Sequence, residues 1–174
     1  MELLVEGGID ACTFQNVAAR AGIERSTLYR RNPDRWPTIV GSIIDLAERE
    51  IEVSNAGTFT ENLSMTLLRL NDILKSPLGP PLLAVAAALK AGVAPGESER
   101  FWASRRKQLA PMFEAAIVRG ELPIDVDREE LFAMAAGPIY FRTFISALHV
   151  DESWIRKLVD RVCHHYCLTP AKPN

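Results

Sequence analysis

The stretch from Thr13 to Arg35 constrains the fold most, because it holds two short helical patterns separated by a glycine. Apolar residues recur in the first pattern at three- and four-residue spacing, which gives a helix one apolar face; they are Phe14, Val17, Ala18 and Ala21. Thr13 precedes this run and is predicted to cap the helix. Gly22 follows it, where a left-handed backbone ends a helix at little steric cost.

A second helix is predicted over Arg25–Arg31, after the turn Gly22-Ile23-Glu24. We expect Ile23 and Leu28 to face inward. The polar side chains are expected to face outward: Ser26, Thr27, Tyr29, Arg30 and Arg31. A short helix, a glycine turn and a second helix rich in Arg, Ser, Thr and Tyr are typical of a helix-turn-helix whose second helix enters the DNA major groove.

The distribution of charge supports this interpretation, although the total charge does not. The net charge of the chain is −2, so the protein as a whole is not a basic nucleic-acid binder. Between residues 25 and 35, however, four arginines stand against the single acidic residue Asp34. A solvated helix face is the alternative explanation, and the surrounding motif argues against it.

The segment GIDACTFQNVAARAGIERSTLYRRNPDR resembles the DNA-binding segment of TetR-type bacterial transcriptional regulators. The resemblance rests on Gly8, Thr13, Val17-Ala18, Ala21-Gly22-Ile23, Ser26-Thr27-Leu28-Tyr29-Arg30, Pro33 and Arg35. Residues 111–146 are similar to the ligand-binding and dimerisation domain of one branch of that family. The resemblance implies an all-α fold of about nine helices. It places a helix-turn-helix domain at 1–37, an effector-binding and dimerisation domain at 38–168, and a disordered tail at 169–174.

The predicted DNA-binding residues lie on the second helix and around it. They are Thr13, Arg25, Ser26, Thr27, Tyr29, Arg30, Arg31 and Arg35. Arginines at such positions meet phosphates or guanine edges. The Tyr29 hydroxyl can bond a phosphate, or its ring can pack against the first helix, and both alternatives remain open. Leu28 is assigned to the core.

The chain departs from the family pattern at three places. Residues 1–6 predict only the end of a helix stopped at Gly7-Gly8, whereas family members usually carry a longer first helix and often a basic arm. We expect either a truncated start or a member that lacks those phosphate contacts. Asn32 stands where an aromatic residue is usual, and Trp36-Pro37 replaces a more polar helix start. Trp36 is expected to supply the aromatic packing.

The rest of the chain carries helical apolar stripes and no alternating strand pattern, which predicts an all-α body. Residues 82–91 are nearly all apolar and predict a central helix. Arg105 is expected to face mostly outward, and Trp102 inward. Asp127 is predicted to form a reciprocal cap with Glu130, and Asp151 is a predicted N-cap. The predicted helices cover 38–55, 60–75, 82–91, 97–119, 128–148 and 151–166.

In the resembled architecture, four of these helices surround an effector cavity. The predicted liners are Leu67, Phe101, Trp102, Arg105, Leu109, Phe113, Met134, Tyr140, Phe141 and Phe144. Such a set suits an apolar or aromatic small molecule if a void exists, and plain core is the alternative for each residue.

The last two predicted helices are expected to build a four-helix dimer interface across a two-fold axis. The predicted interface residues are Ile139, Phe144, Trp154, Leu158 and Val162. A dimer would present its recognition helices to half-sites about 34 Å apart.

The C-terminal run Cys163-His164-His165-Tyr166-Cys167 places two thiols four residues apart on one helix face. A zinc site is conceivable there, but the spacing is not that of a zinc finger, and a helix end with part-buried thiols is the favoured interpretation. No phosphate loop, HExxH motif or nucleophile motif is present, so we expect neither enzymatic activity nor a cofactor.

The sequence therefore predicts a homodimeric regulator that binds double-stranded operator DNA and is released by a small-molecule effector, most simply as a repressor. The alternative is a dimeric all-α small-molecule-binding or interaction protein with a weakened DNA head. An odd number of cysteines, no signal peptide pattern and no apolar run near the roughly 20 residues of a membrane span predict a cytoplasmic protein without a membrane partner.

Overall fold

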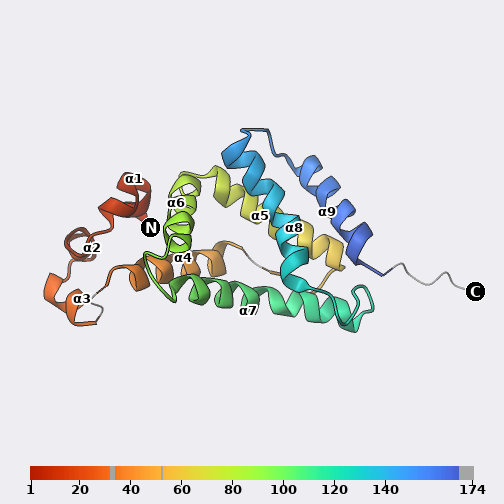
Figure 1. The fold of residues 1–174 in the computed structure, drawn as a ribbon, viewed down its shortest axis with the longest axis horizontal. Coiled ribbons are helices and arrows are strands. Elements are labelled where there is room, and N and C mark those ends of the chain that lie inside the picture. The colour runs from red at the N-terminus through yellow and green to blue at the C-terminus, as the bar shows by residue number, and fades with distance from the viewer. Residues whose placement is uncertain (32–33, 52, 169–174) are drawn as a thin grey trace, which may run out of the picture. The chain divides into compact units, whose positions relative to one another are not determined.

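The computed structural model describes residues 1–31, 34–51 and 53–168, and every regular element within them is a helix (Figure 1). The all-α prediction is confirmed. No helix in the described residues is both long enough and apolar enough to cross a bilayer. The elements are α1 (Glu2–Ala11), α2 (Phe14–Ala21), α3 (Arg25–Arg31), α4 (Trp36–Glu50), α5 (Phe59–Lys75), α6 (Gly79–Lys90), α7 (Glu97–Val118), α8 (Arg128–Tyr140), the π-helix η1 (Phe141–Ile145) and α9 (Glu152–Tyr166).

The chain forms two compact units whose boundaries fall at the end of α4, within α5 and within α7. Unit 1 comprises Met1–Glu50 and Ile73–Arg105, and unit 2 comprises Ile51–Asp72 and the described residues from Arg106 onward. These units are defined by contacts between residues. The predicted functional division into 1–37 and 38–168 remains a prediction, and the predicted tail at 169–174 lies outside the described residues.

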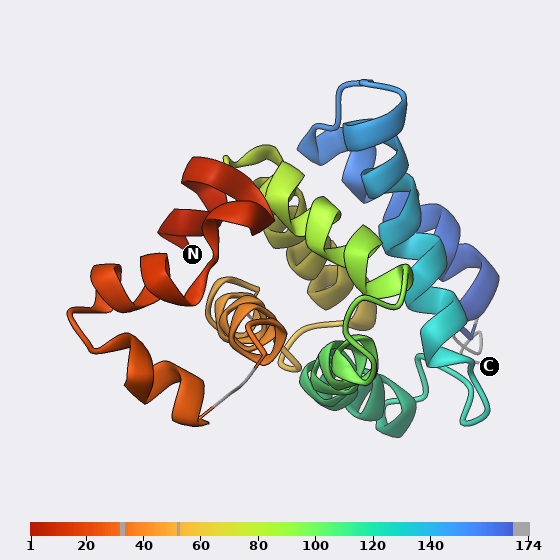
Figure 2. The ribbon, with the colours of Figure 1, turned by 60° about the vertical axis from the view of Figure 1, so that its left-hand side comes forward.

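Unit 1 is built on one cluster of buried side chains from α1, α4 and α6, with Cys12 and Ala94 from the adjoining loops. Figure 2 shows α4 almost end-on, with α1 and α2 to one side of it. Trp36 is only 6% exposed and lies in this cluster, so the expected aromatic packing is confirmed. α2 contacts α1, and α3 packs on α2.

The predicted stop of the first helix at Gly7-Gly8 is confirmed, because both glycines break the helical backbone and divide α1 into two short segments. Gly7 (φ −147°, ψ 20°) and Gly8 (φ 65°, ψ −159°) have non-helical backbones, and a helical turn then resumes as far as Ala11. α4 covers Trp36–Glu50, so the predicted bounds of 38–55 were wrong at both ends. Its start is fixed by Asp34, whose Oδ1 accepts a hydrogen bond from the Trp36 N–H at 3.1 Å.

Unit 2 has a core of aliphatic and aromatic side chains from α5, α7, α8 and α9. The rings of Phe59 and Phe113 lie 5.4 Å apart between centroids, and both side chains are almost fully buried. The two predicted aspartate caps are confirmed. Asp127 accepts from the Glu130 N–H at 2.9 Å, and Asp151 accepts from the Trp154 N–H at 2.7 Å.

The predicted helix over 128–148 was wrong at its C-terminal end. α8 stops at Tyr140 and continues as the wider η1, after which Ala147 has a positive φ of 50°. Pro138 lies inside α8 and has no N–H to donate, which weakens the regular ladder just ahead of the wider winding.

Three further expectations about helix faces were wrong. On α7, Arg105 is 6% exposed and Trp102 is 51% exposed. The buried face of α7 runs through Arg105, Leu109 and Met112 at helical spacing; Trp102 continues this spacing three residues before Arg105, but it is exposed nearer the start of the helix. α6 is not central, because only Gly79, Val85 and Leu89 are buried on it and its other face is exposed. The small side chains of its alanines let a mostly apolar helix remain at the surface.

Candidate DNA-binding head

The turn between α2 and α3 has the geometry that the sequence predicts. The Asn16 N–H donates to Thr13 Oγ1 at 3.2 Å, which confirms the N-cap. Gly22 is left-handed (φ 65°, ψ 30°), and its N–H donates to the carbonyl groups of Ala18 and Ala19. The Ile23 N–H also donates to Ala18 O, at 3.1 Å, so the carbonyl groups of Ala18 and Ala19 near the end of α2 have partners.

One face of α3 is open to solvent. Arg25, Ser26, Tyr29 and Arg30 are exposed, whereas Thr27 and Leu28 are half-buried. The expectation that Ile23 faces inward was wrong, because its residue is 44% exposed at the turn. The side chain of Arg31 lies outside the described residues. An exposed helix face with guanidinium, hydroxyl and phenol groups can reach phosphates and base edges.

Tyr29 links the two helices of the motif. Its ring lies against that of Phe14, with centroids 4.6 Å apart. Arg25 Nη2 donates to the Tyr29 hydroxyl at 3.2 Å, and the guanidinium carbon lies 5.0 Å from the ring centroid. Tyr29 therefore packs against α2, and its hydroxyl stays within reach of solvent because the residue is 45% exposed. This contact orders Arg25 at the start of α3.

A hollow of about 510 Å³ brings four of the predicted DNA-binding residues together: Thr13, Arg25, Tyr29 and Arg35. Phe14, Gln15 and Asp34 complete its lining. The arginines supply positive charge next to the first turn of α2, a combination that suits a phosphate group. Arg35 is partly engaged elsewhere, because its Nη1 donates to Ile9 O at 3.4 Å and its guanidinium lies 6.0 Å from the Trp36 ring centroid.

An ion-pair clamp between α1 and α2 escaped the sequence analysis. Arg20 on α2 contacts the carboxylates of Glu2 and Glu6 at 2.5 Å and 2.6 Å. The hydrogen bond from Arg20 lowers the pKa of Glu6, and the two carboxylates raise the pKa of Arg20. The spacing of four residues between Glu2 and Glu6 indicates that both carboxylates lie on one helix face. Nothing in the sequence identifies Arg20 as their partner.

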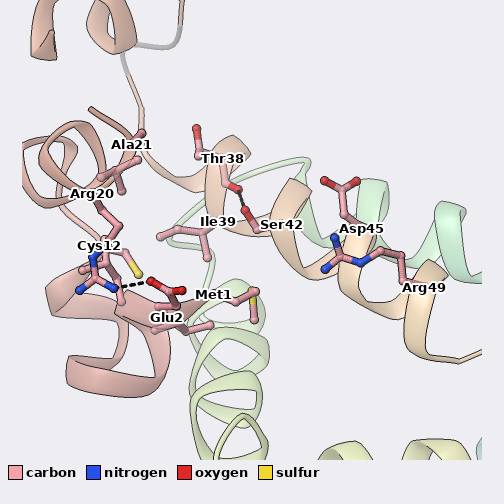
Figure 3. Close-up of a pocket in the computed structure, with 13 residues that line it drawn as sticks. Met1, Glu2, Cys12, Arg20, Ala21, Thr38, Ile39, Ser42, Asp45 and Arg49 are labelled. Carbon is pink, nitrogen blue, oxygen red and sulfur yellow. Dashed lines mark hydrogen bonds and ion pairs between the residues drawn. The ribbon is translucent and has the colours of Figure 1, made fainter. Parts of the chain in front are cut away.

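A second hollow, of about 470 Å³, lies beside this clamp between α1, α2 and α4. Figure 3 shows Arg20 joined to Glu2 on one side of it, Ile39 and Ser42 of α4 across from them, and Asp45 and Arg49 farther along α4. Its lining includes none of the predicted DNA-binding or effector-binding residues.

Comparison with protein families agrees with this geometry. Residues 1–34 match the family described as bacterial regulatory proteins, tetR family, and residues 53–162 match the Tetracyclin repressor-like C-terminal domain. The chain belongs to the TetR family. It is a helix-turn-helix transcriptional regulator, as the resemblance implied.

Individual relatives are similar over most of their length. The chain is 29% identical over 160 residues to the uncharacterized HTH-type transcriptional regulator YdeS of Bacillus subtilis, covering 91% of this chain and 81% of YdeS. It is 26% identical over 167 residues to the uncharacterized HTH-type transcriptional regulator Rv1556 of Mycobacterium tuberculosis, covering 93% and 81%.

Solved structures share the fold of this TetR-family chain. The TetR family transcription regulator SCO0332 superimposes with a TM-score of 0.79 at 24% identity, covering 96% of this chain and 93% of that one. A TetR transcriptional regulator from Agrobacterium tumefaciens has a TM-score of 0.69 at 20% identity, covering 95% and 89%.

The effector residues predicted for this TetR-family member fall into different parts of the fold. Phe101, Trp102 and Arg105 belong to unit 1, where Phe101 packs on the α1–α4–α6 cluster. The others belong to unit 2. Of these, Leu67, Leu109 and Phe113 are buried, Phe144 is half-buried, and Met134, Tyr140 and Phe141 are exposed. Their role in effector binding remains a prediction.

The predicted dimer residues all lie in unit 2 at different depths. Ile139, Leu158 and Val162 are buried within the single chain, and Phe144 and Trp154 are half-buried. Trp154 is covered on one face by Arg142, whose guanidinium carbon lies 4.5 Å from the ring centroid. The exposed apolar residues of this region are Tyr140, Phe141, Ile145 and Leu148. The dimer interface stays a prediction.

The thiol-rich end of α9 does not assemble a metal-binding group. In the described part of the chain, no three side chains of His, Cys, Asp or Glu converge closely enough to hold a metal ion. All three cysteines are free thiols. Cys163 instead accepts a hydrogen bond from the Thr60 hydroxyl at 3.4 Å.

Proposed function

We propose that this TetR-family regulator binds double-stranded operator DNA as a homodimer, acts as a repressor, and releases the DNA when a small-molecule effector binds. The observation that carries the proposal is the exposed face of α3, on which Arg25, Ser26 and Arg30 point to solvent. α3 is held by the left-handed turn at Gly22 and by the Phe14–Tyr29 contact. A recognition helix that is fixed at its start and at Tyr29 enters a groove without a large ordering cost.

Base readout is assigned to the start and the adjoining face of α3, to Arg25, Ser26, Thr27 and Arg30. Phosphate contacts are assigned to Thr13, Tyr29, Arg31 and Arg35 around the head. Phosphate contacts fix the register of the protein on the duplex, and base contacts select the sequence. Two heads related by a two-fold axis would read half-sites about 34 Å apart.

The effector is proposed to be an apolar or aromatic molecule that binds within the C-terminal domain, among the predicted liners Leu67, Leu109, Phe113 and Phe144. The abundance of aromatic and aliphatic side chains there supports this ligand class. Binding would favour a head spacing that no longer matches the operator. Such coupling is reciprocal, so DNA must weaken effector binding by the same factor.

No catalytic step is proposed, since the relatives carry the names of transcriptional regulators. A cytoplasmic location is proposed from the free thiols and the function of the relatives.

DNA selection tests the central claim. The purified protein would be incubated with a library of random duplexes, and the bound fraction would be amplified and sequenced over several rounds. We expect a palindromic motif with half-sites about one helical turn apart, bound far more tightly than a scrambled duplex in an anisotropy titration. The doubly substituted variant Arg25→Ala/Arg30→Ala should lose this preference and keep its helical circular dichroism.

Failure to enrich any sequence would support the rival function, an all-α small-molecule-binding or interaction protein with a weakened head. A thermal-shift screen of small aromatic compounds then separates the two parts of the proposal. A compound that stabilises the protein should weaken binding to the selected duplex, and the duplex should weaken binding of the compound equally. A compound that binds without changing the affinity for the duplex would contradict the release mechanism and leave DNA binding intact.

A further inference from the structure

The end of α9 brings two thiols beside the first turn of α5. Cys163 lies in the last turns of α9, and Cys167 is the residue directly after the helix. The Thr60 hydroxyl donates to Cys163 Sγ at 3.4 Å from the start of α5. Cys163 is 8% exposed and Cys167 is half-buried, so the pair lies at the edge of the unit 2 core.

The backbone of this segment suits a bond between the two sulfur atoms. Four residues along an α-helix advance the chain by about 6 Å, which lies within the Cα separations that disulfides span. Cys167 has an extended backbone (φ −80°, ψ 145°), and only its N–H, which donates to Cys163 O at 2.8 Å, ties it to the helical ladder. Its side chain can therefore turn toward Cys163 without unwinding α9.

The two thiols also differ in chemistry. The hydrogen bond from the Cys167 thiol lowers the pKa of Cys163 to about 7; burial opposes this, the Thr60 hydroxyl adds to it, and the carboxylates of Asp160 and Glu121 oppose it. The same shared hydrogen bond raises the pKa of Cys167. The first turn of α5 adds the positive end of a helix dipole near the sulfur. Cys163 is thus the nucleophile of the pair, and Cys167 supplies the proton and the second sulfur.

We propose that Cys163 and Cys167 are a modification site, a dithiol that hydroperoxides oxidise to an intramolecular disulfide at the end of α9. The Cys163 thiolate attacks one oxygen of hydrogen peroxide, the O–O bond breaks, and the leaving hydroxide takes a proton to become water. Sulfur is oxidised to a sulfenic acid while the peroxide is reduced. Cys167 then attacks the Cys163 sulfur, the S–O bond breaks, and the oxygen leaves as a second water with the Cys167 proton.

The disulfide would form at a junction of three segments of unit 2. The Leu168 N–H, directly after Cys167, donates to Glu121 O at 2.9 Å. The Glu121 carboxylate in turn accepts from the Phe59 N–H at the start of α5 and from Arg119 Nε. Movement of Cys167 toward Cys163 would strain the hydrogen bond from the Leu168 N–H to Glu121 O. Oxidation would therefore alter contacts among α5, the turn after α7 and α9.

Cys12 provides an internal control in the same molecule. It is buried in unit 1, and burial raises the pKa of its thiol. Trypsin separates the sites, because Cys12 lies in the peptide that ends at Arg20, and Cys163 and Cys167 lie together after Arg161. In the reduced full chain at neutral pH, iodoacetamide should label Cys163 at least about tenfold faster than Cys12, because a far larger fraction of it is thiolate. In urea the two rates should converge.

The decisive measurement is mass spectrometry after stoichiometric hydrogen peroxide. We expect the C-terminal peptide to become lighter by two hydrogen atoms and to resist alkylation until it is reduced, while the Cys12 peptide stays unchanged. In Cys167→Ser, oxidation should stop at a sulfenic acid on Cys163 that dimedone traps. Thr60→Val should slow the labelling of Cys163 several-fold, and Thr60→Ser should restore it.

Three results would overturn the proposal: labelling of Cys163 no faster than that of Cys12, oxidation of Cys163 to sulfinic acid without a disulfide, or trapping of the sulfenic acid on Cys167 instead. The readouts are independent of DNA. Loss of operator binding by the whole protein would therefore leave this test unaffected. If Cys167→Ser fails to fold, as circular dichroism would reveal, the wild-type peptide mass still decides the question.

Discussion

The ring of Tyr29 packs on the ring of Phe14, with 4.6 Å between their centroids, and this pair joins the recognition helix to the helix before it. The same tyrosine accepts a hydrogen bond from Arg25 through its hydroxyl. One side chain therefore serves two purposes, since its ring fixes α3 and its hydroxyl orders an arginine proposed to contact DNA. The two purposes can be separated by substitution.

Replacement of Tyr29 by Ala removes both the ring contact and the hydroxyl. We expect a loss of about 1 kcal/mol in the free energy of unfolding, since an aromatic pair contributes about that much and Tyr29 is 45% exposed. Tyr29→Phe keeps the ring and should leave stability unchanged while weakening DNA binding. Urea unfolding and anisotropy with the selected duplex measure the two effects. Equal DNA binding by wild type and Tyr29→Phe would remove the hydroxyl from the proposed interface.

Gly22 is left-handed at φ 65°, and no neighbouring atom lies within 4 Å of a Cβ built there. Gly22→Ala should therefore lower stability by about 1 kcal/mol through backbone strain alone. Gly22→Asn should cost less, because Asn tolerates this conformation. Gly41→Ala is the matched control, since Gly41 is helical and its Cβ would meet only the tip of the Arg100 side chain at 3.3 Å. A thermal melt in which Gly22→Ala is neutral would argue against the turn.

Arg30 is exposed on α3, and its substitution by Ala should weaken operator binding. If the guanidinium meets a phosphate, the slope of log K against log salt concentration should fall by about 1. If it reads a base, specificity at one position should relax, with a loss of about 1–3 kcal/mol. Arg69→Ala removes an exposed charge from α5 and should change neither quantity. Unaltered affinity and slope in Arg30→Ala would exclude Arg30 from the interface.

Protonation of Glu121 should change the free energy of unfolding of unit 2 as the pH falls. Burial raises the pKa of its carboxyl, but the hydrogen bonds from Arg119 and from the Phe59 N–H outweigh burial and lower it. Because the pKa is lower in the folded protein, the ionised carboxylate of Glu121 adds to the free energy of unfolding above the ordinary pKa of 4.5. This stabilisation is lost as the pH falls through the pKa of the folded protein.

Glu121→Gln should therefore be less stable than wild type at neutral pH, and the difference should shrink in acid. Urea unfolding at several pH values measures it. Glu114→Gln is the control, because its carboxylate is 64% exposed and lies 3.8 Å from Arg128, where an ion pair contributes little. A stability difference between Glu121→Gln and wild type that stayed constant through the acid range would contradict this account.

Local sequence signals predicted much of the fold, because they act within a few residues. The caps at Thr13, Asp127 and Asp151 each pair a side-chain oxygen with an N–H three residues ahead. The turn at Gly22 requires a backbone that glycine adopts freely. These features were predictable because their partners are adjacent in the chain, and the helix-turn-helix follows from them.

Features that depend on distant packing were not predictable in the same way. Arg105 is buried because it lies on the face of α7 that the rest of the chain covers, whereas its charge suggested solvent. Trp102, three residues before Arg105 on α7, stays exposed although it is among the most apolar residues of the helix. The spacing of residues along the sequence does not show which side chains of α7 are buried. It also does not show that Arg20 pairs with Glu2 and Glu6.

The break at Gly7 and Gly8 determines when the first helix can form. Neither part of α1 is long enough to persist as an isolated helix. Glu2 and Glu6 gain their common cation only once α2 has placed Arg20, and Leu4 gains its apolar neighbours only once α4 and α6 have come together. The N-terminal segment should consequently assemble last in unit 1, and its amide hydrogens should be the first there to exchange with solvent on warming.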